Sequence, residues 1–263
     1  MSETEFNGTA LLQYERQRQI SLLALRNGSV DVSELAKRFD VTTETIRRDL
    51  SDMQDKGVVR RVHGGAVSIE ARHHEPKVDS RDMQNADEKL RIAQEAIREV
   101  PETGSVLIDS GSTTFRLADV FPVDRNVHVI TNSLVTALAL ARRGVKELSV
   151  PGGGVRIDTF AMVDSQTIDA VRAMRVDVVF MSCDGLSYKR GLTTPYRAEW
   201  LLKRAMIESA RKVVALVDQS KLGNDQLFGF AGLDEIDVLI TDLRADDDTA
   251  EVLGKHGLDV RRV

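Results

Sequence analysis

The sequence predicts an α/β protein with two domains of unequal size: a small, mainly helical N-terminal domain and a larger, doubly wound α/β domain. The length of 263 residues exceeds what one small core needs. Helical periods and a hairpin signal fill the first part, whereas short β-branched runs alternate with helical stretches from Ala86 onward. We place the first domain at 14–70, a linker at 71–85 and the second domain at 86–263.

In the first domain, apolar spacing predicts a helix over Arg18–Leu25 that ends at Asn27-Gly28. Its apolar residues are Ile20, Leu22, Leu23 and Leu25. Asp31 opens a second helix of about two turns, because Glu34 three residues later forms a capping-box-like pair with it. The buried side of this second helix consists of Leu35, Ala36 and Phe39.

A third helix is predicted over Thr43–Lys56, after a tight turn at Asp40-Val41 and with Thr42 as its N-cap. Its apolar residues follow the helical spacing i, i+4, i+7 at Ile46, Leu50 and Met53. At 100° per residue, the opposite face carries Glu44, Arg48, Ser51 and Asp55, with Thr45 and Arg47 on its flanks.

A basic hairpin is predicted directly after this helix. The run Val58–Val62 is β-prone, and Gly64-Gly65 followed by Ala66-Val67 provides the turn and the second strand. Although the net charge of the chain is −5, Lys56–Arg61 carries three positive charges and no acid. Helix, short helix, turn, helix and hairpin together make a winged helix-turn-helix.

The third helix is the strongest functional signal, because an outward arginine on such a helix fits the major groove of DNA. The alternative is a solvated helix whose arginines pair with Glu44, Asp49, Asp52 or Asp55, and for a lone helix we would favour that alternative. Because a turn precedes this helix and a basic hairpin follows it, we favour DNA binding over the solvated-helix alternative. The predicted DNA-contacting residues are Thr42, Thr43, Thr45, Arg47, Arg48, Lys56, Arg60, Arg61 and His63.

In the second domain, seven strands are predicted, separated mostly by helices, which favours a largely parallel sheet of right-handed βαβ units. The strands are Ser105–Asp109, Val127–Thr131, Glu147–Val150, Val176–Met181, Lys212–Val217, Val238–Thr241 and Leu258–Val263. The helices include Asp87–Val100, Ser133–Arg142 and Glu199–Ser209.

A hydroxyl-rich loop follows the first of these strands. The segment Asp109–Thr114 joins a strand to a helix, where backbone N–H groups and the positive helix end favour a phosphate. A plain turn with an N-cap is the equally weighted alternative. Thr131-Asn132 ends the next strand at the same sheet edge, where open α/β folds bind ligands. Gly152-Gly153 follows another strand, as a flexible turn or as a close approach to a ligand.

The string Val32–Leu50, with its Thr-Ile-Arg-Arg-Asp-Leu end, and His63-Gly-Gly-Ala resemble the DNA-binding domain of the DeoR family of bacterial sugar-metabolism regulators. The resemblance extends to Leu222-Gly223 and covers most of the chain. It implies operator binding by an oligomer, a dimer or tetramer, and repression relieved by a phosphorylated sugar or related metabolite. Activation is the alternative outcome. The resemblance also implies that Ser110–Thr114 is the phosphate-binding loop.

The second domain also resembles ribose-5-phosphate isomerase, through Asp184-Gly185, Glu199 with Lys203, and Lys221. A surface pair between Glu199 and Lys203 is the plainer alternative for that spacing. The isomerase pattern expects an Asp-Glu and a Lys-Gly-Gly at positions that here hold Leu186-Ser187 and Tyr196-Arg197-Ala198. Without those acid and base groups we expect ligand binding and no turnover. The alternatives are an isomerase-like enzyme with an accessory DNA-binding domain and an assembly module with a vestigial pocket.

The predicted effector-binding residues share a position at the carboxyl ends of strands or on the helix that follows. They are Asp109, Ser110, Gly111, Ser112, Thr113, Thr114, Thr131, Asn132, Gly152, Gly153, Asp184, Gly185, Glu199, Lys203 and Lys221. One departure from the family is Asp164, which stands where a glycine is usual and whose carboxylate would repel a phosphate unless another group answers it.

Other features argue for a plain cytoplasmic regulator. No apolar stretch reaches the roughly 18 residues of a membrane span, and the acidic N-terminus lacks the order of a secretory signal. The single cysteine, Cys183, suits a reducing compartment and is expected to be packing rather than a nucleophile. His73-His74-Glu75 lacks metal-site spacing, so neither a metal nor a cofactor is expected.

Overall fold

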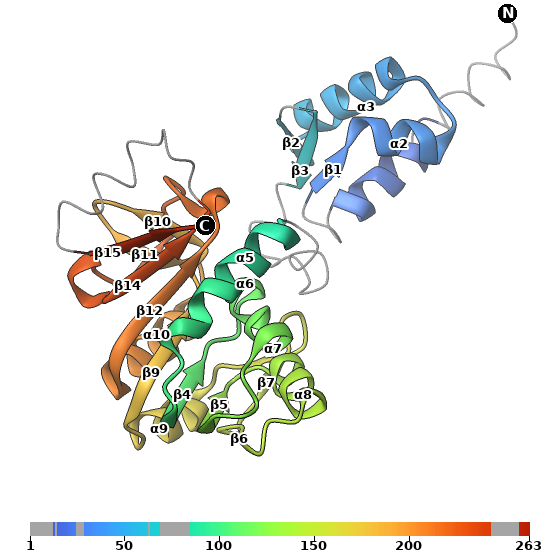
Figure 1. Cartoon of the computed structure of the whole chain (residues 1–263). Helices are drawn as coiled ribbons and strands as arrows, with labels where there is room; N and C mark the ends of the chain where they lie inside the picture. Colours follow the sequence, from blue (N-terminus) through green and yellow to red (C-terminus); the bar gives the residue numbers. More distant parts are fainter. Residues whose placement is uncertain (1–12, 14, 25–28, 63, 69–84, 243–257) are drawn as a thin grey trace, which may run out of the picture. The chain divides into compact units, whose positions relative to one another are not determined.

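The computed structural model describes residues 13, 15–24, 29–62, 64–68, 85–242 and 258–263. The chain divides into two compact units, Met1–Arg81 and Asp82–Val263, which are treated separately below (Figure 1). Within the described residues, no helix is both long and apolar enough to serve as a membrane span.

The first unit is a winged helix-turn-helix, as predicted. Residues 15–24 are helical, and α2 (Val32–Phe39) and α3 (Thr43–Asp55) follow. The wing consists of β2 (Val59–Val62) and β3 (Gly65–Ser68), which pair antiparallel. The three-residue strand β1 (Ser29–Asp31) was not predicted, because it is defined by its pairing with β3, far along the chain.

The helix boundaries of the first unit follow from their caps. The Asp31 carboxylate accepts hydrogen bonds from the backbone N–H groups of Ser33 and Glu34, at 2.7 and 3.0 Å, so the predicted N-cap is confirmed. Asp40 ends α2 in the left-handed conformation, at φ 50°, and Thr42 caps α3 as predicted. The predicted stop at Asn27-Gly28 lies outside the described residues.

One apolar cluster holds the first unit together. Its fully or almost fully buried members are Ile20, Ala24, Val32, Leu35, Ala36, Ile46, Leu50, Met53, Val59 and Ala66. The three predicted apolar residues of α3 are therefore buried. Leu22, which we expected on the apolar side of the first helix, is 55% exposed instead, because it lies on the side of the helix opposite the buried Ile20 and Ala24.

The second unit is built on one seven-stranded parallel sheet with the order β15-β14-β12-β9-β4-β5-β6. The strands are β4 (Thr103–Ile108), β5 (Asn126–Thr131), β6 (Glu147–Ser149), β9 (Val176–Met181), β12 (Ala210–Val217), β14 (Val238–Thr241) and β15 (Asp259–Arg262). All seven predicted strands are present, and every pairing between them is parallel.

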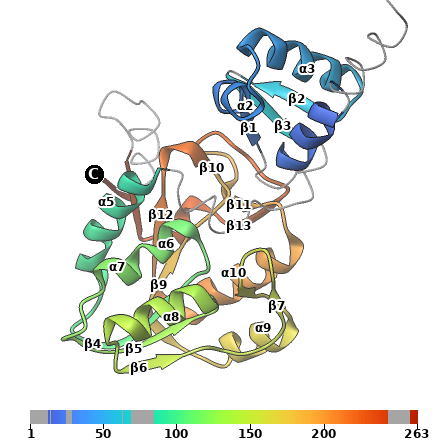
Figure 2. The ribbon, with the colours of Figure 1, turned by 90° about the vertical axis from the view of Figure 1, so that its right-hand side faces the viewer.

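Helices cover both faces of this sheet (Figures 1 and 2). On one face lie α5 (Ala86–Ala96), α6 (Ser112–Phe115), α7 (Leu117–Val120) and α8 (Leu134–Arg143). On the other lie α9 (Ser165–Arg172) and α10 (Arg197–Ser209). Among the described residues of this unit, 3-10 turns also lie at Ile97–Glu99, Gln219–Lys221 and Leu233–Glu235. The sheet is therefore doubly wound.

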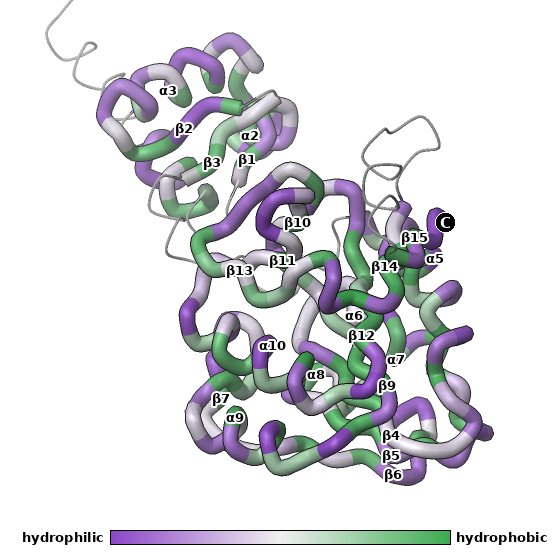
Figure 3. Tube along the Cα trace, turned by 90° about the vertical axis from the view of Figure 1, so that its left-hand side faces the viewer, coloured by the Kyte–Doolittle hydropathy of each residue, from purple (hydrophilic) through white to green (hydrophobic). Residues whose placement is uncertain are grey.

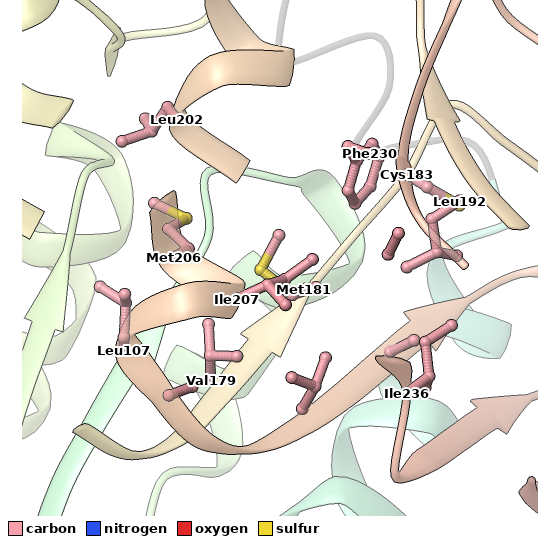
Figure 4. Close-up of a cluster of buried hydrophobic side chains, with 14 of the residues drawn as sticks. Leu107, Val179, Met181, Cys183, Leu192, Leu202, Met206, Ile207, Phe230 and Ile236 are labelled. Carbon is pink, nitrogen blue, oxygen red and sulfur yellow. The ribbon is translucent and has the colours of Figure 1, made fainter. Parts of the chain in front are cut away.

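Alternating residues of each strand supply the two apolar layers, which appear as hydrophobic stretches along the strands in Figure 3. In β4, Val106 and Ile108 join the cluster beneath α5, α7 and α8, whereas Leu107 joins the cluster beneath α9 and α10. Figure 4 shows the second of these clusters, where Leu107 and Val179 lie near Leu202 and Met206 of α10.

Several short strands were not predicted. The hairpin of β7 (Val155–Arg156) and β8 (Ala161–Met162) follows the glycine-rich segment. A separate antiparallel sheet contains β10 (Gly185–Ser187), β11 (Gly191–Thr194) and β13 (Phe228–Ala231). These strands have two to four residues, so no alternation of side chains is long enough to reveal them.

Candidate DNA-binding surface and effector site

Arg48 lies on the exposed face of α3, as the helical wheel predicts. No ion pair or hydrogen bond engages its guanidinium among the described residues. Arg47 is also exposed and approaches the Glu44 carboxylate at 3.3 Å, with side-chain exposures of 53% and 83%. Pairs this exposed are screened by water and hold an arginine weakly. The outward side of α3 therefore carries two arginines that a ligand can reach.

The acidic residues on the inner side of α3 contact the first helix rather than these arginines. Asp49 is 1% exposed and accepts from Arg16 Nε at 2.5 Å and from Gln17 Nε2 at 3.2 Å. Asp52 accepts from Gln13 at 3.0 Å. Of the pairings that the solvated-helix alternative requires, the described contacts contain only the exposed Arg47–Glu44 pair.

The two threonines at the start of α3 already serve the helix. Thr42 Oγ1 accepts from the Thr45 backbone N–H at 3.2 Å and lies 2.9 Å from the Thr45 hydroxyl. At the other end, Lys56 is exposed and donates to Gln17 Oε1 at 3.2 Å. Thr43 is exposed in the first turn, where the helix dipole favours a phosphate.

The wing presents Arg60 and Arg61 to solvent on β2. Its orientation relative to α3 is fixed, because the Arg61 backbone N–H donates to Gln54 Oε1 of α3 at 2.8 Å. His63 lies outside the described residues. The first unit therefore combines an exposed basic helix face with a basic β-strand.

The candidate effector site of the second unit lies where the order of the strands reverses. The chain runs from the central strand β4 outward to β5 and β6, then crosses back to β9 on the other side of β4. Asp109 follows β4 and Ser182 follows β9, and Asp109 N–H donates to Phe180 O at 3.0 Å. Crevices at the carboxyl ends of strands at such a switch point are the usual ligand sites of open parallel sheets.

A buried ion pair lies at these strand ends. Lys203 Nζ donates to Asp109 Oδ2 at 2.5 Å and to Ser182 O at 3.0 Å. The two side chains are 7% and 1% exposed. Burial opposes the charge on Lys203, but Asp109 and Glu199 outweigh it, so the Lys203 pKa lies above its ordinary value. The plainer alternative for this spacing, a surface pair between Glu199 and Lys203, is wrong, because both residues are buried and each forms an ion pair with another partner.

The loop after Asp109 is stiffened from within. The Thr114 hydroxyl accepts from Gly111 N–H at 2.9 Å and donates to Asp109 O at 2.6 Å, and Thr114 is fully buried. A Cβ at Gly111 would lie 1.9 Å from Ser182 Oγ, so only glycine fits there. Thr113 is nearly buried, whereas Ser110 and Ser112 are partly exposed.

Asn132 connects this loop to the strand beside it. Its Nδ2 donates to Ser110 Oγ at 3.1 Å and to Met162 O at 3.2 Å, and the whole residue is buried. Within the described residues, Asn132 Oδ1 has no hydrogen-bond partner. Its neighbour Thr131 is also buried and accepts from Ser133 N–H at 3.2 Å. A buried amide oxygen without a partner is costly unless a bound molecule or water satisfies it.

A second polar group forms beside Glu199, at the start of α10. Thr194 Oγ1 lies 3.0 Å from Asp184 Oδ2 and 3.1 Å from Glu199 Oε2. Arg156 donates to Glu199 Oε1 at 2.5 Å and stacks on the Tyr196 ring, 4.5 Å from its centroid. Arg156 and Thr194 were not predicted as site residues, because β7 and β11, which carry them, gave no sequence signal.

Asp164 does not face an open phosphate site. Its carboxylate accepts from Gly154 N–H at 2.6 Å and from Thr167 N–H at 2.9 Å, and it caps α9. These backbone hydrogen bonds, first from Thr167 and then from Gly154, lower the Asp164 pKa. Gly152 and Gly153 have positive φ values of 82° and 109°, and Gly152 O accepts from the Thr167 hydroxyl at 2.6 Å. The Asp164 side chain thus occupies the Gly154 N–H donor of the glycine segment.

The last predicted cation, Lys221, is partly exposed after β12. No ion pair engages its ammonium group among the described residues. Its neighbour Asp218 is 1% exposed and accepts from Asn85 Nδ2 at 3.0 Å. Asn85 is the residue that precedes α5. Gly185 lies on β10 and has no room for a side chain, because a Cβ would meet Asn224 O at 1.6 Å.

Cys183 is buried between these groups, and burial raises its thiol pKa to about 12. A thiol in that state is not a nucleophile at neutral pH. No cluster of metal-ligating side chains is present in the described part of the second unit or the first. His73-His74-Glu75 lies outside the described residues.

Comparisons with known proteins agree along the whole chain. Residues 16–72 match the DeoR-like helix-turn-helix domain, and residues 84–243 match the DeoR C terminal sensor domain. The HTH-type transcriptional regulator GlpR of Haloferax volcanii is 34% identical over 95% of this chain and 98% of its own. IolR of Bacillus subtilis is 30% identical over 93% and 97%. The glycerol-3-phosphate regulon repressor of Escherichia coli is 28% identical over 93% and 96%.

Ribose 5-phosphate isomerase is among the matching solved structures. The enzyme from Methanocaldococcus jannaschii matches with a TM-score of 0.39 and 20% identity, over 53% of this chain and 55% of its own.

Proposed function

The chain belongs to the DeoR family of transcriptional regulators, and we therefore propose that it represses carbohydrate-metabolism genes by holding operator DNA until a phosphorylated sugar releases it. It is a regulator and not an enzyme, like the relatives it matches over nearly their whole length. The observation that carries the DNA-binding role is the exposed Arg48, which forms no ion pair with the described residues, on a helix that is hydrogen-bonded to the basic strand β2.

The proposed DNA contacts divide into two kinds. Arg48, with Arg47 beside it, enters the major groove and reads base edges, because one α-helix fills that groove. Arg60 and Arg61 bind the phosphate backbone, which adds affinity without sequence preference. We propose that the protein works in the cytoplasm as a dimer or tetramer, since paired half-sites about 34 to 36 Å apart need two helices held together.

The proposed effector site is the loop at Ser110–Thr114 together with Asn132 and Lys221. Ser110 and Ser112 offer hydroxyl groups, and Lys221 offers a positive charge that attracts the Asp218 carboxylate but forms no ion pair among the described residues. Asn132 Oδ1 needs a donor, which a bound water or a hydroxyl of the ligand supplies. Asp109, Lys203 and Thr114 shape the site and do not touch the phosphate, because hydrogen bonds within the protein already engage them.

The DNA-binding role is tested with an operator selected from a pool of random duplexes. We expect the native protein to bind one sequence tightly, and Arg48→Ala to lose that preference with an unchanged melting temperature, since the side chain faces outward. Lys37→Ala, at an exposed position of α2, is the matched control. An unchanged affinity of Arg48→Ala for the selected duplex contradicts the assigned reading face.

The effector role is tested with a panel of sugar phosphates and their unphosphorylated sugars. At least one phosphorylated compound should raise the melting temperature, because it binds only the native state, and should weaken operator binding. A thirtyfold loss of affinity corresponds to about 2 kcal/mol of coupling, which is common between two sites. If no compound changes either quantity while operator binding persists, the DNA-binding role stands and phosphate control is wrong.

A further inference from the structure

Arg156 is the cationic side chain that the β7–β8 hairpin brings to the candidate effector site. Its Nη1 donates to Glu199 Oε1 at 2.5 Å, and its guanidinium lies over the Tyr196 ring. Tyr196 immediately precedes α10, and Glu199 is in the first turn of that helix. Stacking and ion pairing together hold the guanidinium in one orientation.

Two carboxylates of this region are joined through one hydroxyl. Thr194 Oγ1 lies within hydrogen-bond distance of both Asp184 and Glu199, at 3.0 and 3.1 Å, and it donates its single proton to one of them at a time. Glu199 is nearly buried, whereas the Arg156 side chain is 26% exposed. A ligand therefore approaches the group from the side of Arg156.

The Arg156, Glu199 and Asp184 side chains together suit hydrogen bonding to hydroxyl groups of a ligand and not binding of a phosphate. Ionised carboxylates only accept hydrogen bonds and a guanidinium only donates them, whereas an alcohol does both. Two neighbouring alcohols can donate to Glu199 or Asp184 and accept from Arg156. A phosphate here would meet two negative charges, and the other nearby cation, Lys203, is buried against Asp109.

We propose that Arg156, with Glu199 and Asp184, reads the hydroxyl-bearing end of the effector, which is a polyhydroxylated phosphate ester with adjacent hydroxyl groups. This inference rests on the proposed function, in which the Ser110–Thr114 loop binds the phosphate. The phosphate loop supplies affinity for any phosphate ester, and the Arg156 group supplies the preference among them.

A matched pair of ligands measures this preference. Ribitol 5-phosphate and n-pentyl phosphate share a five-carbon chain and a phosphate and differ in the hydroxyl groups. In calorimetry, the dissociation constant of the wild-type full-length protein should be roughly tenfold lower for ribitol 5-phosphate than for pentyl phosphate, or lower still. Hydrogen bonds to charged groups contribute a free energy of binding of that size. Inorganic phosphate, as a third probe, reports on the loop alone.

Arg156→Ala should reduce the ratio of the two dissociation constants by roughly tenfold and leave the affinity for inorganic phosphate unchanged. Arg156→Lys should restore part of the ratio, because lysine keeps the charge and loses the planar fork. Arg142→Ala, at an exposed position in the last turn of α8, is the control and should keep the wild-type ratio. A melting curve for each variant verifies folding.

An Arg156→Ala protein that is folded and keeps the wild-type ratio overturns the inference while leaving phosphate control intact. An equal loss of affinity for all three probes also overturns it, because Arg156 would then support the phosphate loop or the fold. If the wild-type protein binds none of the probes, both the inference and the effector part of the proposed function are wrong.

Discussion

Two basic residues with similar sequence surroundings occupy opposite environments. Arg48 and Lys203 each lie on a helix among acidic neighbours, and either one could have formed a surface pair. Arg48 is exposed, and no described side chain pairs with it, because Asp49 and Asp52 contact the first helix and Glu44 pairs with Arg47. Lys203 is buried and its ammonium contacts Asp109, 94 residues away in the sequence. Helical spacing predicts on which side of a helix a residue lies, but it does not predict which other element packs against that side.

Replacement of Lys203 by alanine should lower the free energy of unfolding by about 3 to 5 kcal/mol, because the variant leaves the Asp109 charge buried without a partner. Urea unfolding of the second domain measures this loss. The double variant Asp109→Asn with Lys203→Met should recover most of it, since both charges are then removed. Lys189→Ala, at an exposed position, is the control. A loss below about 1 kcal/mol for Lys203→Ala would show that the pair does not stabilise the fold.

At the scale of elements, the wing and the recognition helix act as one surface, because β2 is hydrogen-bonded to α3 through Arg61 and Gln54. Their roles differ in chemistry. A helix side chain in the major groove distinguishes sequences, whereas a basic strand beside it neutralises phosphates. The salt dependence of binding separates these two contributions.

Replacement of both Arg60 and Arg61 by alanine should weaken binding to all duplexes alike and reduce the slope of log affinity against log salt by about 2. Filter binding at several salt concentrations measures the slope. The control removes two exposed cations from the second domain, as Arg142→Ala with Lys189→Ala. A wing variant with the wild-type slope would mean that β2 does not touch phosphate.

Asp164, which stands where the family usually has a glycine, is the N-cap residue of α9. Asp164 supplies its own carboxylate to the N–H groups of Thr167 and Gly154, so the negative charge that looked repulsive to a phosphate is satisfied within the protein. The Gly152–Gly154 segment is consequently a structural support of α9. Its positive φ values at Gly152 and Gly153 permit the approach.

The Asp164 cap should give a pH-dependent contribution to stability. The folded pKa of Asp164 is lowered below its ordinary value of 3.8, so its contribution is present above pH 3.8 and is lost as the pH falls through the folded pKa. Asp164→Ala should therefore lower the urea midpoint at pH 7, and the difference from wild type should shrink below pH 3.8. Asp158→Ala, at an exposed position, should show no such trend. A pH-independent difference would exclude a role for the ionised carboxylate.

For the whole molecule, the second domain combines a buried ion pair with the proposed phosphate loop and the proposed hydroxyl-binding group, and it lacks the Asp-Glu and Lys-Gly-Gly segments of the isomerase pattern. Leu186 is fully buried on β10, and Tyr196 is engaged beneath Arg156. Such a domain can bind a sugar phosphate and leave it unchanged. The hydrogen bond between Asp218 and Asn85 places the start of α5 in contact with the strand end that precedes Lys221.

Incubation of the purified protein with ribose 5-phosphate should therefore produce no ribulose 5-phosphate above the rate in buffer. A coupled spectrophotometric assay measures the product, with an authentic isomerase as the positive control. Turnover that disappears in Glu199→Gln would mean that the second domain is an enzyme after all.

Local sequence patterns are sufficient to predict the winged helix-turn-helix, the seven parallel strands and the position of the candidate phosphate loop. These features depend on local signals, such as caps, helical spacing, β-branched runs and a strand-to-helix loop, and each signal lies within a few residues of the element it predicts. The proposed DNA-reading face is also predicted by a local signal, because a helical wheel places Arg48 opposite Ile46 and Leu50.

The contacts among the predicted polar residues, in contrast, follow from how the chain folds in space. Asp109 with Lys203, and Glu199 with Arg156, are pairs separated by 94 and 43 residues, and no periodicity links their members. The reversal of strand order brings the ends of β4 and β9 together, and the short strands β7 and β11 bring Arg156 and Thr194 to Glu199. Charge pairing inside a fold depends on distance in space, and the sequence specifies only distance along the chain.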